Sequence, residues 1–196
     1  MFISHDDSDH HGNLHEVMDA CPNATLVANW FLCERLKAER LDVAPTRWRW
    51  IGDGDTLDVG DRPLHAIRPP LYDSPTTRGL FDPTTGVYWA SDCYATPVLA
   101  GAPTVADIDP EFWIEGFTMF QTWNSPWVSM LDHDAFAESA RTIEQLGVTT
   151  IAGAHTPTIP STHLDQAFTM LRAMPTTPAP PMPDQAALDQ MLATLQ

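Results

Sequence analysis

Basic side chains are scarce in this chain of 196 residues, which carries 10 Lys and Arg against 26 Asp and Glu and a formal net charge of −16 at pH 7. Nucleic-acid phosphates and anionic membrane surfaces are bound mainly through Lys and Arg. The charge therefore argues against both as partners. A solvated acidic surface accounts for most of the excess, but carboxylates gathered around cations would also contribute to it.

Cysteines and long apolar runs are scarce as well. Cys21, Cys33 and Cys93 are too few and too scattered for a disulfide framework or a cysteine-rich zinc site, so we interpret them as buried free thiols. No apolar run approaches the roughly 20 residues that a membrane span needs. Residues 1–7 show no signal-peptide pattern. We therefore expect a soluble, cytoplasmic protein that does not contact a membrane.

The remaining composition is that of a globular domain, with 43% hydrophobic and 18% charged residues. Hydrophobic periodicity and turn residues predict short strands at residues 2–4, 25–28, 47–51, 64–67, 79–81, 87–90 and 148–152. Helices are predicted at residues 13–20, 30–41, 110–146 (broken at 124–126) and 161–174. This succession indicates a layered α/β or α+β domain.

Composition also divides the chain. We expect one domain over residues 1–174, and a stiff linker at residues 175–183, where five of nine residues are proline. Residues 184–196 form a predicted C-terminal helix, because the apolar residues Leu188, Met191, Leu192 and Leu195 recur on one face.

The strongest functional signal lies in residues 5–10, directly after the first predicted strand. In an extended polar loop, alternation would project His5, Asp7 and Asp9 to one side, while His10 can turn to another. Imidazoles and carboxylates arranged in this way suit two adjacent cations. A solvated acidic loop is the alternative interpretation.

Three further motifs follow in order: Asp73 in a turn at residues 73–77, Asp92 after the strand that follows the hairpin turn at 82–86, and His155 in the turn at 153–157. This order resembles the metallo-β-lactamase superfamily, whose first motif is His-x-His-x-Asp-His. The resemblance covers residues 1–160. It implies an α/β fold, the αβ/βα sandwich of that superfamily.

The resemblance also implies a ligand set. One divalent metal ion would be held by His5, Asp7, Asp73 and Asp92, and the other by Asp9, His10, Asp92 and His155, with Asp92 bridging. Asp7 and Asp73 stand where the superfamily usually has His, so that four carboxylates would balance two divalent cations. This oxygen-rich set favours iron or manganese, with zinc as a further candidate. Without metal, the carboxylates would repel and raise each other's pKa values.

An acidic residue in place of the second His is typical of the flavodiiron proteins, and the aromatic, helical residues 112–151 resemble the corresponding stretch of that group more loosely. This resemblance implies a non-haem diiron site that binds or reduces oxygen or nitric oxide. The chain has no flavodoxin-like domain after residue 160. Electrons would then come from a separate flavin or iron–sulfur donor.

Two alternatives remain open. The first is a hydrolase of a small ester, thioester or lactone, in which Asp9 is the catalytic residue that orients a metal-bound water. The second is a non-catalytic sensor or a degenerate fragment. Only four residues precede His5, where the superfamily has its first strands. We therefore expect an N-terminally truncated domain without the first strands of its N-terminal sheet, whose exposed edges favour homodimerisation.

Overall fold

The computed structural model describes residues 1–39 and 41–194. Residue 40, in the predicted helix 30–41, and residues 195–196, including Leu195 of the predicted apolar stripe, lie outside the described residues. The first part of the chain contains α1 (Ser8–His11), α2 (Leu14–Ala20), β1 (Leu26–Ala28), α3 (Trp30–Ala38), the 3₁₀ turn η1 (Pro45–Arg47), β2 (Trp48–Trp50), β3 (Thr56–Asp58) and β4 (Pro63–Ile67).

The second part contains β5 (Gly79–Asp82), β6 (Val87–Trp89), η2 (Val105–Asp107), α4 (Pro110–Asn124), η3 (Pro126–Met130), α5 (His133–Glu144), β7 (Thr150–Ala152), β8 (Ile159–Pro160), η4 (Ser161–His163), α6 (Leu164–Ala173), η5 (Met174–Thr176) and α7 (Gln185–Thr194). The short strands β3 and β8 were not predicted. β3 has a single apolar residue, Leu57, and β8 consists of one isoleucine and one proline, so neither shows the pattern of a strand.

The strands form two sheets. β1 and β2 pair in parallel, and Phe2 forms an isolated parallel bridge to Val27 on the other side of β1. The larger sheet has the sequential order β3-β4-β5-β6-β7-β8. Its neighbours are antiparallel except β6 and β7, which are parallel because the chain crosses over through α4 and α5 between them.

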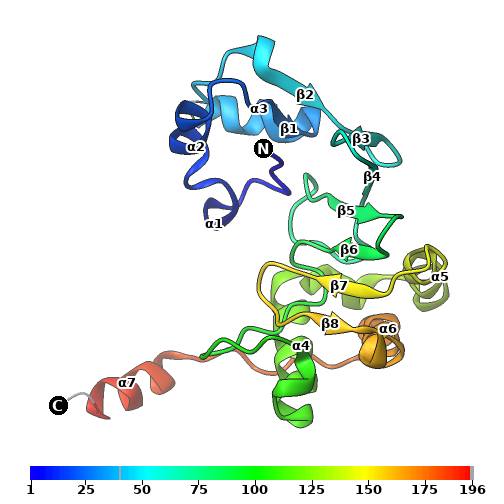
Figure 1. Ribbon diagram of the computed structural model, residues 1–196. Helices are drawn as coiled ribbons and strands as arrows, with labels where there is room; N and C mark the ends of the chain where they lie inside the picture. Colours follow the sequence, from blue (N-terminus) through cyan, green and yellow to red (C-terminus); the bar gives the residue numbers. More distant parts are fainter. Residues whose placement is uncertain (40, 195–196) are drawn as a thin grey trace.

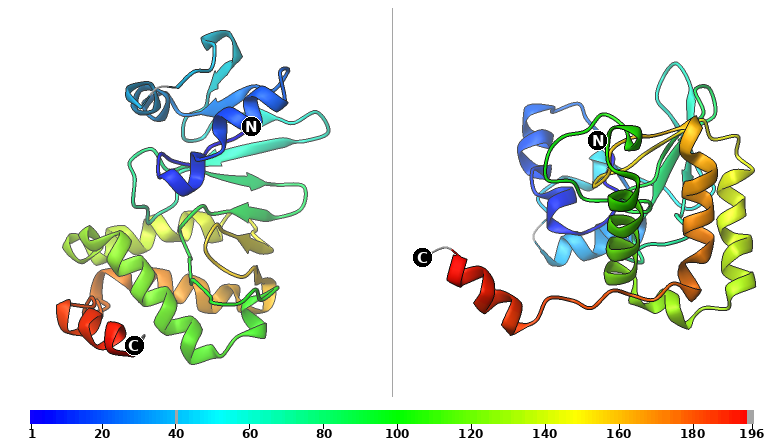
Figure 2. Two further views of the ribbon diagram at one scale, coloured as in Figure 1. Left: turned by 90° about the vertical axis from the view of Figure 1, so that its left-hand side faces the viewer. Right: turned by 90° about the horizontal axis from the view of Figure 1, so that it is seen from below.

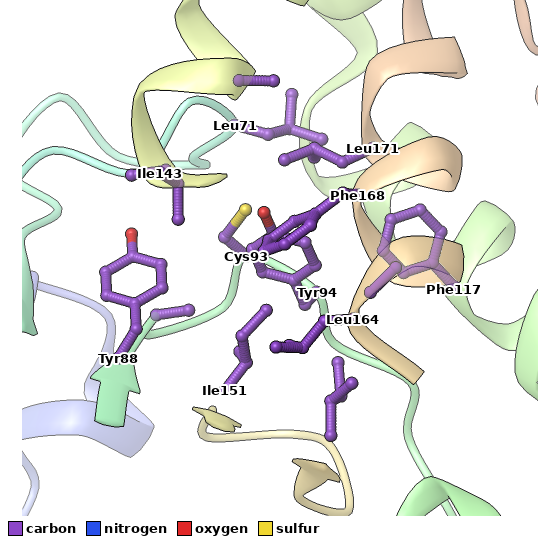
Figure 3. Close-up of a cluster of buried hydrophobic side chains, with 14 of the residues drawn as sticks. Leu71, Tyr88, Cys93, Tyr94, Phe117, Ile143, Ile151, Leu164, Phe168 and Leu171 are labelled. Atoms are coloured by element: carbon purple, nitrogen blue, oxygen red, sulfur yellow. The ribbon is translucent and has the colours of Figure 1, made fainter. Parts of the chain in front are cut away.

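The main core lies between β5–β8 and the helices α4, α5 and α6. Tyr88 and Ile151 point from neighbouring strands toward Phe168 of α6 and Ile143 of α5 (Figure 3), and all four side chains are buried. α5 and α6 lie side by side against this face of the sheet (Figure 2). A separate small core holds α2, β1 and α3 together at the other end of the molecule (Figure 1).

The C-terminal segment extends away from the body of the protein and ends in α7 (Figure 1). The indole of Trp123 on α4 donates to the Pro180 carbonyl at 2.9 Å, which fixes the proline-rich stretch. No side chain of α7 is buried within the described residues. None of the helices in the described part of the chain is long and apolar enough to cross a membrane.

Candidate metal centre

The topology brings four separate chain segments to one edge of the large sheet. β6 and β7 are parallel neighbours, so their carboxyl ends meet there, and Asp92 and His155 each follow three residues after a strand end. β5 runs antiparallel to β6, which places the start of β5, and therefore the preceding turn with Asp73, at the same edge. The N-terminal segment with His5 reaches this edge because the Arg78 amide donates to the Ser4 carbonyl at 2.9 Å.

The prediction of an extended polar loop over residues 5–11 is wrong from residue 8 onward. Asp7 has an extended backbone, but Ser8–His11 form the helical turn α1, in which the His10 amide donates to the Asp7 carbonyl at 2.9 Å. The alternation of an extended backbone therefore applies only up to Asp7, where it directs His5 and Asp6 to opposite sides. The helical turn presents Asp9 and His10 toward His155 instead, because its side chains fan out at helical rather than alternating angles.

The turn after β6 has an unusual backbone. Ser91 adopts a φ of 54°, in the left-handed region that residues other than glycine seldom occupy. This conformation presents the Ser91 hydroxyl to Nδ1 of His5 at 3.2 Å, next to Asp92. Gly153, at the end of β7, packs against this turn so closely that a Cβ atom would lie 3.0 Å from the Ser91 carbonyl.

The structure brings His5, Asp7 and Asp73 together in one group. Nε2 of His5 lies 3.7 Å from Oδ2 of Asp7 and 3.8 Å from Oδ2 of Asp73, and 3.9 Å from Oδ2 of Asp92. These separations are too long for hydrogen bonds but suit atoms that converge on a common cation. We name this group the Asp73 position.

Asp9, His10 and His155 form a second group, which we name the His155 position. Nε2 of His155 lies 3.1 Å from Oδ2 of Asp9 and 3.3 Å from Nε2 of His10. Asp92 lies between the two positions: its Oδ1 is 3.2 Å from His10, and its Oδ2 is 3.5 Å from His155 and near His5. All seven predicted ligands therefore lie close together, and a third group, His5, His10 and Asp92, joins the two positions.

The imidazole of His5 gives a direct test of whether a metal fits. Its side chain is completely buried, and Nδ1 lies 3.1 Å from the Ser4 hydroxyl. Nε2 has no hydrogen-bond partner among the described residues, yet it points into the group of carboxylates. A buried nitrogen left unpaired in this way is costly, and a metal ion bound there would satisfy it.

The charges of the surrounding side chains also fit a pair of metal ions. Among the described residues, no Lys or Arg forms an ion pair with any of the four carboxylates, whose partners within 4 Å are the three imidazoles. Burial raises the pKa of Asp73, and Asp92 and Asp7 nearby raise it further. This agrees with the predicted repulsion. Burial also works to raise the pKa of Asp92, but a hydrogen bond with His10 and the other imidazoles outweigh it and lower the pKa. Asp92 therefore departs from the prediction.

One side of the site is open. The side chains of Asp7 and Asp9 are 54% and 56% exposed, while His155 is 33% exposed and packs beside Phe120, with ring centroids 5.6 Å apart. A cavity of about 370 Å³ borders the outer side of His155 and is lined mainly by small and apolar residues such as Val98 and Pro157. Of the seven candidate ligands, His155 is the one that lines this cavity.

Sequence reasoning missed the residues that support the ligands. Asp6 accepts hydrogen bonds from Ser74 and Thr76, and Ser91 contacts His5. Ser74, Thr76 and Thr77 stand out in the sequence as neighbouring hydroxyl residues. Their partner Asp6, however, is 68 positions from Ser74 and 70 positions from Thr76. Only the packing of the N-terminal segment against the turn after β4 reveals these contacts.

Comparisons with solved structures place this geometry among known folds. The chain is similar to the flavodiiron protein from Giardia intestinalis (20% identity, TM-score 0.75, 89% of this chain and 41% of that chain). It is also similar to rubredoxin oxygen:oxidoreductase from Desulfovibrio gigas (14% identity, TM-score 0.69, 87% and 42%). A third similar structure is a peroxy diiron species of the chemotaxis sensor ODP (17% identity, TM-score 0.67, 97% and 74%).

These matches confirm the predicted metallo-β-lactamase-like fold. The chain spans about two fifths of the first two of these chains and about three quarters of the sensor chain. No protein-family model matches the chain, and no curated protein is significantly similar to it in sequence.

Proposed function

We propose that the protein is a dinuclear non-haem iron protein that binds or reduces oxygen or nitric oxide. The observation that carries the proposal is the convergence of three imidazoles and four carboxylates, including the unpaired, fully buried Nε2 of His5, without a Lys or Arg among the described residues to balance the charge. Four carboxylates balance two divalent cations, and mixed oxygen and nitrogen ligands suit iron.

His5, Asp7 and Asp73 would hold one iron, Asp9, His10 and His155 the other, and Asp92 would bridge them. Two adjacent irons supply electron transfer to a small diatomic ligand when they are bound. The protein contributes the position of the ligands: Ser4 and Ser91 hold the His5 ring through Nδ1, which leaves Nε2 for the metal. Gln121 donates to the Asp92 carbonyl at 3.0 Å and fixes the bridging segment.

We expect a small molecule to approach from the exposed sides of Asp9 and His155, beside Phe120. Asp9 is placed to orient a water or ligand there. For reduction, we propose a separate flavin or iron–sulfur protein as electron donor. Manganese and zinc are the alternative occupants.

The test is metal analysis followed by gas exposure. Protein loaded anaerobically with Fe²⁺ should retain two irons per chain, and oxygen or nitric oxide should then change its visible absorption. Asp92→Asn should lose both irons, because Asp92 contacts imidazoles of both positions. His133→Ala is the matched control, because His133 is an exposed histidine on α5 outside the site.

Zinc retained in place of iron, with turnover of an ester, thioester or lactone panel, would support the hydrolase instead. Iron retained without any spectral response to either gas would contradict the proposal.

A sensing role is the second candidate, and a specific observation favours it: the match to the chemotaxis sensor spans 97% of this chain and 74% of that one. A sensor binds its ligand without sustained turnover. The two roles therefore separate in a consumption assay with a chemical reductant, in which a sensor shows one spectral change per iron pair and no continuing loss of oxygen.

A further inference from the structure

Asp6 lies inside the metal-binding segment but points away from the metals. Extended neighbours project to opposite sides, so Asp6 faces α3 and the turn after β4 while His5 faces the site. Its side chain is only 2% exposed, and its ion pair with Arg35 of α3 compensates the buried charge. Oδ1 of Asp6 accepts hydrogen bonds from Ser74 Oγ at 2.6 Å and Thr76 Oγ1 at 2.7 Å.

These hydrogen bonds reach the turn that carries Asp73, which belongs to the Asp73 position and not to the His155 position. Ser74 follows Asp73 directly, and its backbone amide donates to Oδ1 of Asp73 at 2.8 Å. Asn29, at the start of α3, donates to the Thr76 carbonyl. The turn that carries Asp73 is therefore tied to the N-terminal segment, and α3 supports both.

The turn that carries His155 is held by hydrogen bonds that do not involve Asp6, Ser74 or Thr76. The Thr96 amide donates to the His155 carbonyl at 3.0 Å, and the Ala154 amide donates to the Ser91 carbonyl at 2.9 Å. Among the described residues, neither Ser74 nor Thr76 contacts this turn through a hydrogen bond. Ser4 contacts a residue of each position, because its Oγ lies 3.1 Å from Nδ1 of His5 and 3.3 Å from Nδ1 of His10. The hydroxyls of Ser74 and Thr76, in contrast, bond to Asp6 and within the turn that carries Asp73.

We propose that Asp6 is a positioning residue for the Asp73 position alone: with Arg35, Ser74 and Thr76 it fixes the carboxylate of Asp73 opposite His5. This inference rests on the proposed metal centre but not on its chemistry with gases. Hydrogen-bond partners that orient metal ligands commonly contribute about 10–100-fold to metal affinity.

The experiment isolates each position and titrates it with Co²⁺ alone, followed by visible absorption. One background, His10→Ala with His155→Ala, leaves the Asp73 position. The other, Asp7→Ala with Asp73→Ala, leaves the His155 position. Into each background we introduce Thr76→Val, which removes only the hydroxyl, or Thr76→Ser, which keeps it.

Thr76→Val should weaken Co²⁺ binding about 10–100-fold in the first background and leave it unchanged in the second. Thr76→Ser should bind like its parent in both. Thr122→Val is the matched control, because the buried Thr122 hydroxyl bonds only to carbonyls of its own helix. Arg35→Ala, at a side chain that is 48% exposed, provides a second variant should Thr76→Val not fold.

If the unaltered chain binds two Co²⁺ ions, the inference is overturned when Thr76→Val weakens Co²⁺ binding equally in both backgrounds or weakens it in neither. An unaltered, folded chain that binds no Co²⁺ would instead overturn the metal centre, and the positioning role with it.

Discussion

Asp73 and Asp92 are carboxylates of the same site whose pKa values shift in opposite directions. Asp92 contacts three imidazoles, which stabilise its charge. Asp73 lies within ion-pair distance of His5 only, and is influenced by the negative charges of Asp92 and Asp7. The metal-free site is therefore strained mainly at Asp73. A cation at that position relieves a repulsion that the protein alone does not balance.

Asp73→Asn should stabilise the metal-free protein at pH 7. The folded-state pKa of Asp73 is raised, so its ionised form opposes folding at neutral pH and this penalty disappears as the pH falls through the raised value. An amide keeps an oxygen for the Ser74 amide. Thermal unfolding in the presence of a chelator measures the effect, and the gain over the unaltered chain should vanish at acidic pH.

With metal bound, Asp73→Asn should be less stable than the unaltered chain. Metal at 100 times its dissociation constant stabilises a native protein by about 2.7 kcal/mol, and Asp73→Asn should lose much of this stabilisation. If Asp73→Asn destabilises the metal-free protein, the hydrogen bonds of the Asp73 carboxylate outweigh the repulsion that it experiences.

Among the elements, the β5–β6 hairpin connects the Asp73 turn to the Asp92 turn. Asp82 begins its turn and accepts from the Thr84 amide and the Thr85 hydroxyl, each at 2.8 Å. Arg62, directly before β4, lies 3.2 Å from the Asp82 carboxylate. Desolvation works to raise the pKa of Asp82, but these hydrogen bonds and the Arg62 charge outweigh it and lower the pKa.

Asp82→Asn should therefore destabilise the protein at neutral pH. A lowered folded-state pKa gives stability that is present above the ordinary Asp range and lost as the pH falls through the folded value. The difference between variant and parent should shrink below about pH 4. Urea unfolding at several pH values measures it. Asp134→Asn, at a fully exposed carboxylate on α5, is the control and should show no such pH-dependent difference.

At the scale of the whole molecule, the C-terminal helix contributes little to the folded body. The side chains of Leu188, Met191 and Leu192 are all exposed. In the described part of the chain, the hydrogen bond from Trp123 to the Pro180 carbonyl is the last one between this segment and the body. Truncation after Pro183 should change the free energy of unfolding by no more than about 0.5 kcal/mol and leave metal stoichiometry unchanged. Chemical denaturation and metal analysis test this. A large loss of stability would mean that α7 packs against the body in solution.

Homodimerisation stays a prediction, and the whole-molecule charge sets its salt dependence. β2 and β3 are edge strands, and the aromatic side chains of Trp30, Phe31 and Trp50 are 55%, 42% and 54% exposed. Two copies that each carry a net charge of −16 repel each other. Because salt screens this repulsion, the dimer fraction in light scattering should rise with ionic strength. A dimer fraction that falls with added salt would contradict an apolar interface.

The sequence by itself determined the fold class and the candidate ligands. Asp92 and His155 were recognisable because their motifs follow the first motif and Asp73 in the order that the metallo-β-lactamase superfamily shows. Residue type then gave the balance of four carboxylates and three imidazoles in the candidate set. Short motifs and their order along the chain were sufficient for this resemblance, because both can be read without knowledge of the packing.

Only the tertiary structure decided how the ligands are held. The helical turn at Ser8–His11, the left-handed Ser91 and the ties from Asp6 to Ser74 and Thr76 all join or reshape segments through long-range packing. A hydroxyl 70 positions from its carboxylate leaves no local signal. Such a hydrogen bond stabilises the protein only after folding has removed both groups from water. The sequence therefore indicates the candidate ligands, and the packing decides their arrangement.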